Sequence, residues 1–161
     1  MGFVAVAPPP PPTPSSAPRA VVEHDGWYPA TEPALLREAM RVTETVTEAR
    51  LLEAIYSAQD YVGRELRAWR LRHEAEGAVS MAAVEPEVQI DFEAALVRRY
   101  RRAVFNLVMA DVCETYRDVT ATKDGADRAE QKALGAGDYR RNATHAIRDI
   151  LGADPTDVEL I

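Results

Sequence analysis

The sequence predicts an all-α protein: a bundle of about four helices, two or three of them long, between a flexible proline-rich N-terminal arm and an extended C-terminal tail. Apolar residues recur at steps of three and four over long stretches, which places them on one helical face. Seven of the 11 prolines fall in the first 20 residues. At 161 residues the chain has the length for one core. We therefore expect a disordered arm at 1–24, a helical bundle domain at 25–152 and a tail at 153–161.

The arm is expected to be extended because proline has no amide proton for a helix or a sheet. Its prolines are Pro8 to Pro12, Pro14 and Pro18. The arm is either a solvated tether or a docking peptide for the groove of a partner. We expect order to begin near Trp27, where Gly26-Trp27-Tyr28-Pro29 provides aromatic side chains that can pack onto a bundle.

Two helices are predicted in the first half of the bundle. Thr31 is the expected cap of a short helix through Met40, with Pro33 in its first turn. Thr47 is the expected cap of a long helix over 48–76, which Gly77 ends. Asp60 and Arg64 are spaced to form an ion pair on that helix. Its buried face is predicted to contain Leu51, Ile55, Ala58, Val62, Leu66 and Trp69.

A third helix is predicted to start after Pro86, with Asp91 as its cap, and to continue to about residue 118. Two apolar stripes place this helix in the middle of the bundle. One stripe is Leu96, Tyr100, Ala103 and Leu107; the other is Phe105, Met109, Val112 and Tyr116.

The last helix is predicted to start at a cap provided by Thr122 or Asp124 and to continue to Leu151. Gly135 and Gly137 predict a kink or break inside it, because glycine disfavours a helix interior. Gly152 is the expected stop. Its apolar face is predicted to contain Tyr139, Ala143, Ala146, Ile147, Ile150 and Leu151.

The composition disfavours several classes of function. A net charge of -7 disfavours tight binding of nucleic acid. Cys113 is the only cysteine and is expected to be a buried core residue. We expect no signal peptide and no membrane anchor. The three histidines lack ligand spacing and no phosphate-binding or nucleophile motif is present, so we expect no metal, no cofactor and no enzymatic activity.

Two arginine clusters and the C-terminus are the candidate interaction features. One cluster surrounds Tyr100 and the other surrounds Trp69; they contain Arg98, Arg99, Arg101, Arg102, Arg64, Arg67, Arg70 and Arg72. Solvated or intersubunit salt bridges are the favoured interpretation, with DNA or protein contact as the alternatives. The tail ends in apolar residues that a monomer would expose, so it either folds back on its own bundle or docks on a neighbouring subunit. The candidate docking residues are Val158, Glu159, Leu160 and Ile161.

Fragments spread from Trp27 to the C-terminus resemble the head completion/stabilisation proteins of contractile-tailed temperate phages, the gene product L family. They are Gly26-Trp27-Tyr28-Pro29, Met40-Arg41-Val42, Thr45-Val46-Thr47, Tyr100-Arg101-Arg102-Ala103-Val104, Tyr116-Arg117-Asp118, Arg128-Ala129-Glu130, Arg148-Asp149-Ile150-Leu151-Gly152 and Val158-Glu159-Leu160-Ile161. The longer arm and the glycine pair depart from the family pattern.

The resemblance implies a structural protein of the virion neck that is assembled in the host cytoplasm. Such a protein binds the portal protein after DNA packaging, forms a ring of about twelve copies, and provides a platform for tail or tail-terminator proteins. It encloses DNA without sequence-specific binding and is not associated with a membrane. The alternative function is a small helical interaction or regulatory module that uses residues 8–18 to bind a host partner.

Overall fold

The computed structural model describes residues 21–119 and 126–152 and confirms a mainly α-helical protein. These residues form five α-helices, one short 3-10 helix and one small antiparallel sheet. The elements are α1 (Pro33–Met40), α2 (Glu48–Glu65), α3 (Arg67–Ala75), η1 (Met81–Ala83), β1 (Gln89–Ile90), β2 (Glu93–Ala94), α4 (Ala95–Val119) and α5 (Ala126–Leu151).

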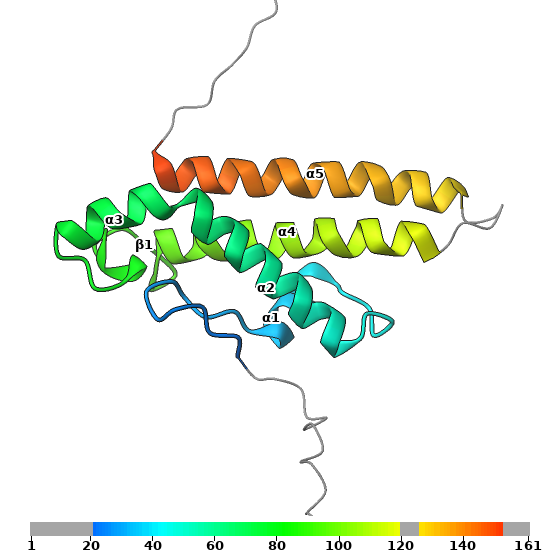
Figure 1. Cartoon of the computed structure of the whole chain (residues 1–161), viewed down its shortest axis with the longest axis horizontal. Helices are drawn as coiled ribbons and strands as arrows, with labels where there is room; N and C mark the ends of the chain where they lie inside the picture. Colours follow the sequence, from blue (N-terminus) through cyan, green and yellow to red (C-terminus); the bar gives the residue numbers. More distant parts are fainter. Residues whose placement is uncertain (1–20, 120–125, 153–161) are drawn as a thin grey trace, which may run out of the picture.

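The central element is α4, as its two apolar stripes predict. It lies alongside α5, and α2 crosses it at an angle (Figure 1). Tyr100 is 1% exposed and Ala103 is fully buried, while Phe105, Met109 and Val112 are each at most 8% exposed. The helix therefore buries side chains on more than one side, against α1, α2 and α5. The side chain of Tyr116 lies outside the described residues.

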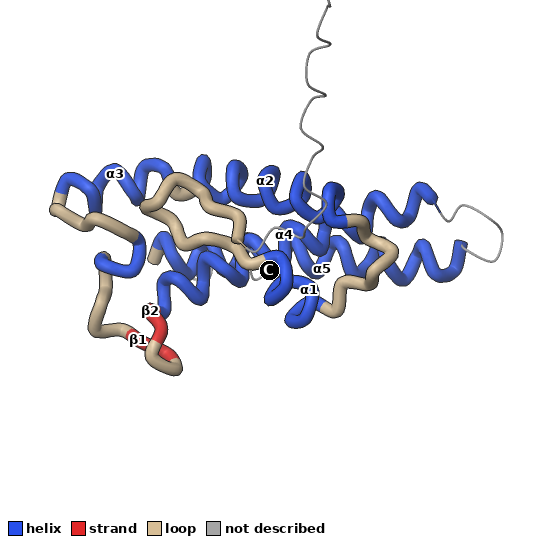
Figure 2. The backbone as a smooth tube through the Cα atoms, turned by 90° about the horizontal axis from the view of Figure 1, so that it is seen from below, coloured by secondary structure: helices blue, strands red, loops and turns tan. Residues whose placement is uncertain are grey.

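A strap formed by residues 21–32 runs across the bundle ahead of α1 (Figure 2). Val22 and Thr31 form an antiparallel bridge, with N–O distances of 2.8 and 2.9 Å. Val22 is only 1% exposed. The packed part of the chain therefore begins before Trp27, the residue near which the sequence predicted order to begin. The prediction that Thr31 caps α1 is wrong: Glu32 holds the cap position without a side-chain bond, and Thr31 accepts a hydrogen bond from Gln59 instead. Pro33 does lie at the start of the helix.

The predicted helix over 48–76 is present as two helices. Thr47 caps α2 by accepting from the Arg50 amide at 3.4 Å, as predicted. Leu66, with φ -90° and ψ 0°, interrupts the helix while remaining fully buried. The break reorients α3, and Trp69 packs edge-on against Trp27 at a centroid separation of 5.8 Å. The predicted face from Leu51 to Trp69 is buried throughout, and Gly77 ends the segment at φ +99°.

The prediction that Asp91 caps the third helix is wrong, because that region forms a β-hairpin. Gln89 pairs with Ala94 and Ile90 pairs with Glu93, so Asp91 and Phe92 form the two-residue turn. Both turn residues have positive φ, 53° and 60°, as a primed hairpin turn requires. The segment 88–93 alternates apolar and polar residues, which is the period of a strand. The helix therefore starts only at Ala95.

The predicted break at Gly135 and Gly137 is also wrong, because α5 is continuous from Ala126 to Leu151. Packing against α4 buries Ala136 to 2% exposure between the two glycines, and such burial stabilises a helix beyond its local propensity. Gly152 ends α5 at φ +68°. Leu151 is 39% exposed rather than part of the buried face. The candidate caps Thr122 and Asp124, like residues 1–20 and 153–161, lie outside the described residues.

Candidate interaction surfaces

The described residues contain no group of three or more His, Cys, Asp or Glu side chains that could hold a metal ion. His24 lies in the strap, His73 in α3 and His145 in α5. Within 21–119 and 126–152, none of the helices has both the length and the apolar character to cross a bilayer.

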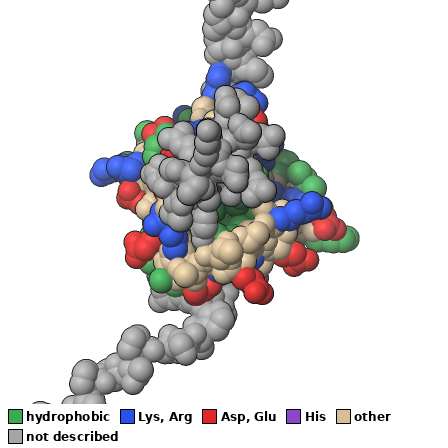
Figure 3. Space-filling view, turned by 90° about the vertical axis from the view of Figure 1, so that its right-hand side faces the viewer, with side chains coloured by type: hydrophobic (Ala, Val, Ile, Leu, Met, Phe, Trp, Pro, Cys, Tyr) green, Lys and Arg blue, Asp and Glu red, His purple; other side chains and the backbone are tan. Residues whose placement is uncertain are grey.

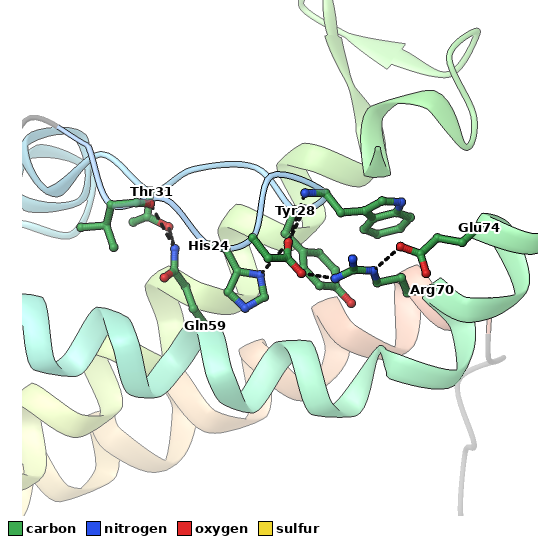
Figure 4. Close-up of polar contacts among 9 residues, drawn as sticks. His24, Tyr28, Thr31, Gln59, Arg70 and Glu74 are labelled. Carbon is green, nitrogen blue, oxygen red and sulfur yellow. Dashed lines mark hydrogen bonds and ion pairs between the residues drawn. The ribbon is translucent and has the colours of Figure 1, made fainter. Parts of the chain in front are cut away.

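A polar and aromatic cluster, which we call the strap lock, fixes the strap to α3 (Figure 4). It contains Asp25, Trp27, Tyr28, Arg70 and Glu74. Arg70 pairs with Asp25 and, through Nε, with Glu74 at 2.8 Å. Its guanidinium lies 5.0 Å from the ring centroid of Trp27 and 5.2 Å from that of Tyr28, which are cation–π distances. One arginine therefore joins two separate parts of the chain.

The carboxylate of Asp25 organises the backbone of the strap. Its Oδ1 accepts from the amides of Trp27 and Tyr28, at 3.1 and 3.3 Å. Burial disfavours the charged form, but the hydrogen bonds from Arg70 and from these two amides outweigh it and lower the pKa of Asp25. The carboxylate is thus held in its charged form at neutral pH.

Beneath the strap, buried tyrosines connect it to α4. Tyr28 stacks on Tyr100 with ring centroids 5.2 Å apart and an interplanar angle of 12°. Burial raises the pKa of Tyr28 to about 12 and raises that of Tyr100 as well. Neither hydroxyl has a hydrogen-bond partner among the described atoms. These tyrosines therefore stabilise the strap through ring packing.

An apolar groove with a polar end lies between α2, α4 and α5. Its volume is about 310 Å³. Tyr61, Leu107 and Ile147 supply its larger apolar surfaces, and Tyr61 is 43% exposed. Glu114 and Arg140 form an ion pair across one part of the lining, and the hydrogen bond that Arg140 donates to the Glu114 carboxylate raises the pKa of Arg140. The groove holds no constellation of catalytic groups and has the character of a docking surface.

The end of the molecule that carries α3 and the hairpin exposes several large apolar side chains. They are Leu71, Val79, Val88, Ile90 and Phe92. Phe92 is 97% exposed and Val79 is 83% exposed. Large apolar side chains exposed in this way are typical of surfaces that contact another protein. The sequence signal was present in the alternating pattern of 88–93, which was instead interpreted as the approach to a helix.

Some arginines of the two clusters form salt bridges with acids of this chain, whereas the intersubunit salt bridges that the sequence also suggested stay a prediction. Arg98 and Arg101 both pair with Glu93, and Arg64 pairs with Asp60 at 3.2 Å. Arg70 pairs within the strap lock. Figure 3 shows the opposite end of the molecule, away from α3, where basic and acidic side chains are interspersed around the residues drawn in grey. The predicted docking residues Val158, Glu159, Leu160 and Ile161 lie outside the described residues.

Comparisons with known proteins match the chain to a phage protein family. The family model described as phage head completion protein (GPL) matches residues 22–161. The head completion/stabilization protein of Escherichia phage P2 is 33% identical over 132 residues, covering 82% of this chain and 78% of that protein. No solved structure is significantly similar to the chain. A family match that includes the strap, all five helices and the C-terminus shows that this chain belongs to the phage head completion protein (GPL) family.

Proposed function

We propose that this protein completes the phage head at the virion neck, where it binds the portal protein after DNA packaging. About twelve neighbouring copies form a ring that stabilises the filled head and provides a platform for tail or tail-terminator proteins. The observation that carries the proposal is the family match across residues 22–161, which includes the whole described bundle. The exposed apolar side chains at the α3 and hairpin end support it, since a ring requires contacts between copies.

The charge of the chain supports passage of DNA through such a ring without sequence-specific binding. A net charge of -7 makes each copy repel the phosphate backbone overall. Four arginines of the two clusters are engaged with acids of the same chain, which lowers their availability to phosphates. We expect no retention of duplex DNA by the purified protein at about 0.15 M salt. Tight, salt-sensitive retention would contradict this part of the proposal.

The decisive experiment examines DNA-filled heads and the cognate portal by electron microscopy, with and without the purified protein. Addition of the protein is expected to produce a ring of density at the portal vertex and to reduce loss of DNA from filled heads. Sedimentation with the isolated portal should yield a complex of defined stoichiometry. Heads that retain DNA and accept tails equally well without the protein would refute the proposed function.

We further propose that Val158, Glu159, Leu160 and Ile161 hold the ring on the portal or on a neighbouring copy. The support is chemical: apolar side chains at a chain end gain burial when a partner covers them. Deletion of 158–161 should leave the helical content unchanged and abolish association with the portal. Deletion of residues 1–20 is the matched control and should leave that association intact. Loss of association in the arm deletion alone would favour the alternative module that binds through its prolines.

A further inference from the structure

The β1–β2 hairpin is an acidic, apolar projection. Phe92 is 97% exposed, Ile90 is 55% exposed and Val88 is 40% exposed. The segment 85–93 contains four acidic residues and no lysine or arginine. Among these acids Glu87 and Asp91 are exposed and form no ion pair with any described residue. The hairpin therefore presents apolar side chains next to carboxylates that the described bundle leaves available.

The backbone of Phe92 adds an independent observation. Its φ of 60° lies in the left-handed region, which a bulky side chain rarely adopts. Glycine is the preferred second residue of this turn type. A phenylalanine there costs stability, and its exposed ring recovers none of that cost in a single copy. Strain of this kind persists at positions where function requires the side chain.

The outer face of α3 has the complementary chemistry. Leu71 is 55% exposed, and the neighbouring Ala68 and Ala75 are exposed as well. Arg67 and Arg72 are exposed on the same helix and pair with no acid in the described part of the chain. The face of α3 therefore offers apolar side chains flanked by two available cations, and the hairpin offers apolar side chains flanked by two available carboxylates, so the two surfaces are complementary in charge.

The two surfaces belong to opposite sides of the molecule. Figure 2 shows α3 along one edge and the hairpin projecting from the other edge at the same end. The hairpin is anchored by α4, which begins immediately after it at Ala95, so it has no freedom to reach α3 of its own copy. When two different surfaces on opposite sides of a molecule bind each other, the same contact repeats from copy to copy. The copies close into a ring when the rotation between neighbours adds up to a full turn.

We propose that the β1–β2 hairpin of one copy docks on the outer face of α3 of the next copy, with Phe92 against Leu71 and with Glu87 and Asp91 facing Arg67 and Arg72. This inference rests on the proposed ring and identifies the surfaces that build it. The occupant of each surface is therefore a second copy of this chain.

The first test replaces Phe92 in the full-length chain, and assembly is followed by sedimentation velocity with and without the cognate portal. Phe92→Gly suits the turn, so its melting temperature should equal or exceed that of the wild type. Its self-association should nevertheless weaken by about tenfold or more, as for an interface hot spot. A Phe92→Gly protein that assembles like the wild type overturns the inference, because a residue that serves only the turn would show that result.

The second test uses charge reversal. Glu87→Arg and Arg67→Glu should each impair assembly alone, because each places like charges across the contact. A mixture of the two variants should assemble, since each hairpin then finds an α3 of opposite charge on the other variant. Glu44→Arg, in the exposed loop before α2, is the matched control and should assemble normally. Failure of the mixture to assemble overturns the inference.

The two proposals fail in different ways. If the wild type forms a ring on the portal and neither set of variants affects it, the hairpin contact is wrong and the proposed function stands. If the wild type neither binds the portal nor forms a ring, the proposed function fails and this contact fails with it.

Discussion

Replacement of Arg70 by methionine tests whether the strap lock stabilises the fold. The substitution removes ion pairs to Asp25 and Glu74 and the cation–π contacts with Trp27 and Tyr28. The three charged side chains are 24 to 37% exposed, so each ion pair is worth only about 0.5 kcal/mol. The contacts with the two rings are worth about 0.5 to 1 kcal/mol each. We therefore expect Arg70→Met to lower the free energy of unfolding by about 2 kcal/mol.

Urea denaturation followed by circular dichroism measures this loss, which corresponds to a midpoint lower by about 1 M. The fluorescence of Trp27 and Trp69 should shift toward the red at the same time, because Arg70 no longer covers Trp27. Arg64→Met is the matched control. It removes an ion pair whose side chains are both 68% exposed, and it should change stability by less than about 0.5 kcal/mol. If the two variants are equally stable, the strap lock does not hold the strap.

Three further predictions follow from the burial and charge of single residues. Tyr100→Phe removes a buried hydroxyl that has no partner among the described atoms, and should raise the free energy of unfolding by about 1 kcal/mol. A large drop in the melting temperature would instead indicate that the hydroxyl forms a hydrogen bond to a water molecule. The lowered pKa of Asp25 stabilises the fold above its unfolded pKa near 4, and this contribution is lost as the pH falls through the lower folded value. Stability measured from about pH 6 to about pH 2 should therefore fall less steeply in Asp25→Asn. Ile55→Ala, at a fully buried position, should lower the free energy of unfolding measured by urea denaturation by about 3 kcal/mol. Leu71→Ala, at a position that is 55% exposed, should lower it by less than about 0.5 kcal/mol.

Local signals predicted most helical faces and several helix ends correctly. The apolar face from Leu51 to Trp69 is buried, Thr47 caps α2, and Gly77 and Gly152 end their helices with positive φ. These features depend on residues close together in sequence, and the physical preferences of those residues are local.

Predictions failed where distant parts of the chain decide the outcome. Thr31 has the chemistry of a cap, but its backbone forms a bridge with Val22 and its hydroxyl accepts a hydrogen bond from Gln59, so it belongs to the strap. Gly135 favours a break in isolation, yet packing on α4 maintains α5. Asp91 can cap a helix or occupy a left-handed turn, and the pairing of Ile90 with Glu93 selects the turn.

For the candidate surfaces too, local features were predictable from the sequence and long-range features were not. The sequence predicted the ion pair of Asp60 with Arg64, which the structure confirms, while the solvated or intersubunit salt bridges favoured for the arginine clusters stay a prediction. It did not indicate that Asp25, 45 residues away along the chain, joins Arg70. It also did not indicate that Phe92 is 97% exposed. Exposure and long-range pairing depend on how elements are placed, which periodicity within one element does not encode.

By itself the sequence determined that this protein is mainly helical, which faces of its helices are apolar, and, through its resemblance, the family to which it belongs. Only the tertiary structure decided that the strap is held by Arg70, that α5 continues through its glycines, and that an apolar hairpin projects from the edge opposite α3. The physical reason is that helix propensity and periodicity act over a few residues, whereas burial free energy and ion pairing act between residues that only the folded chain brings together.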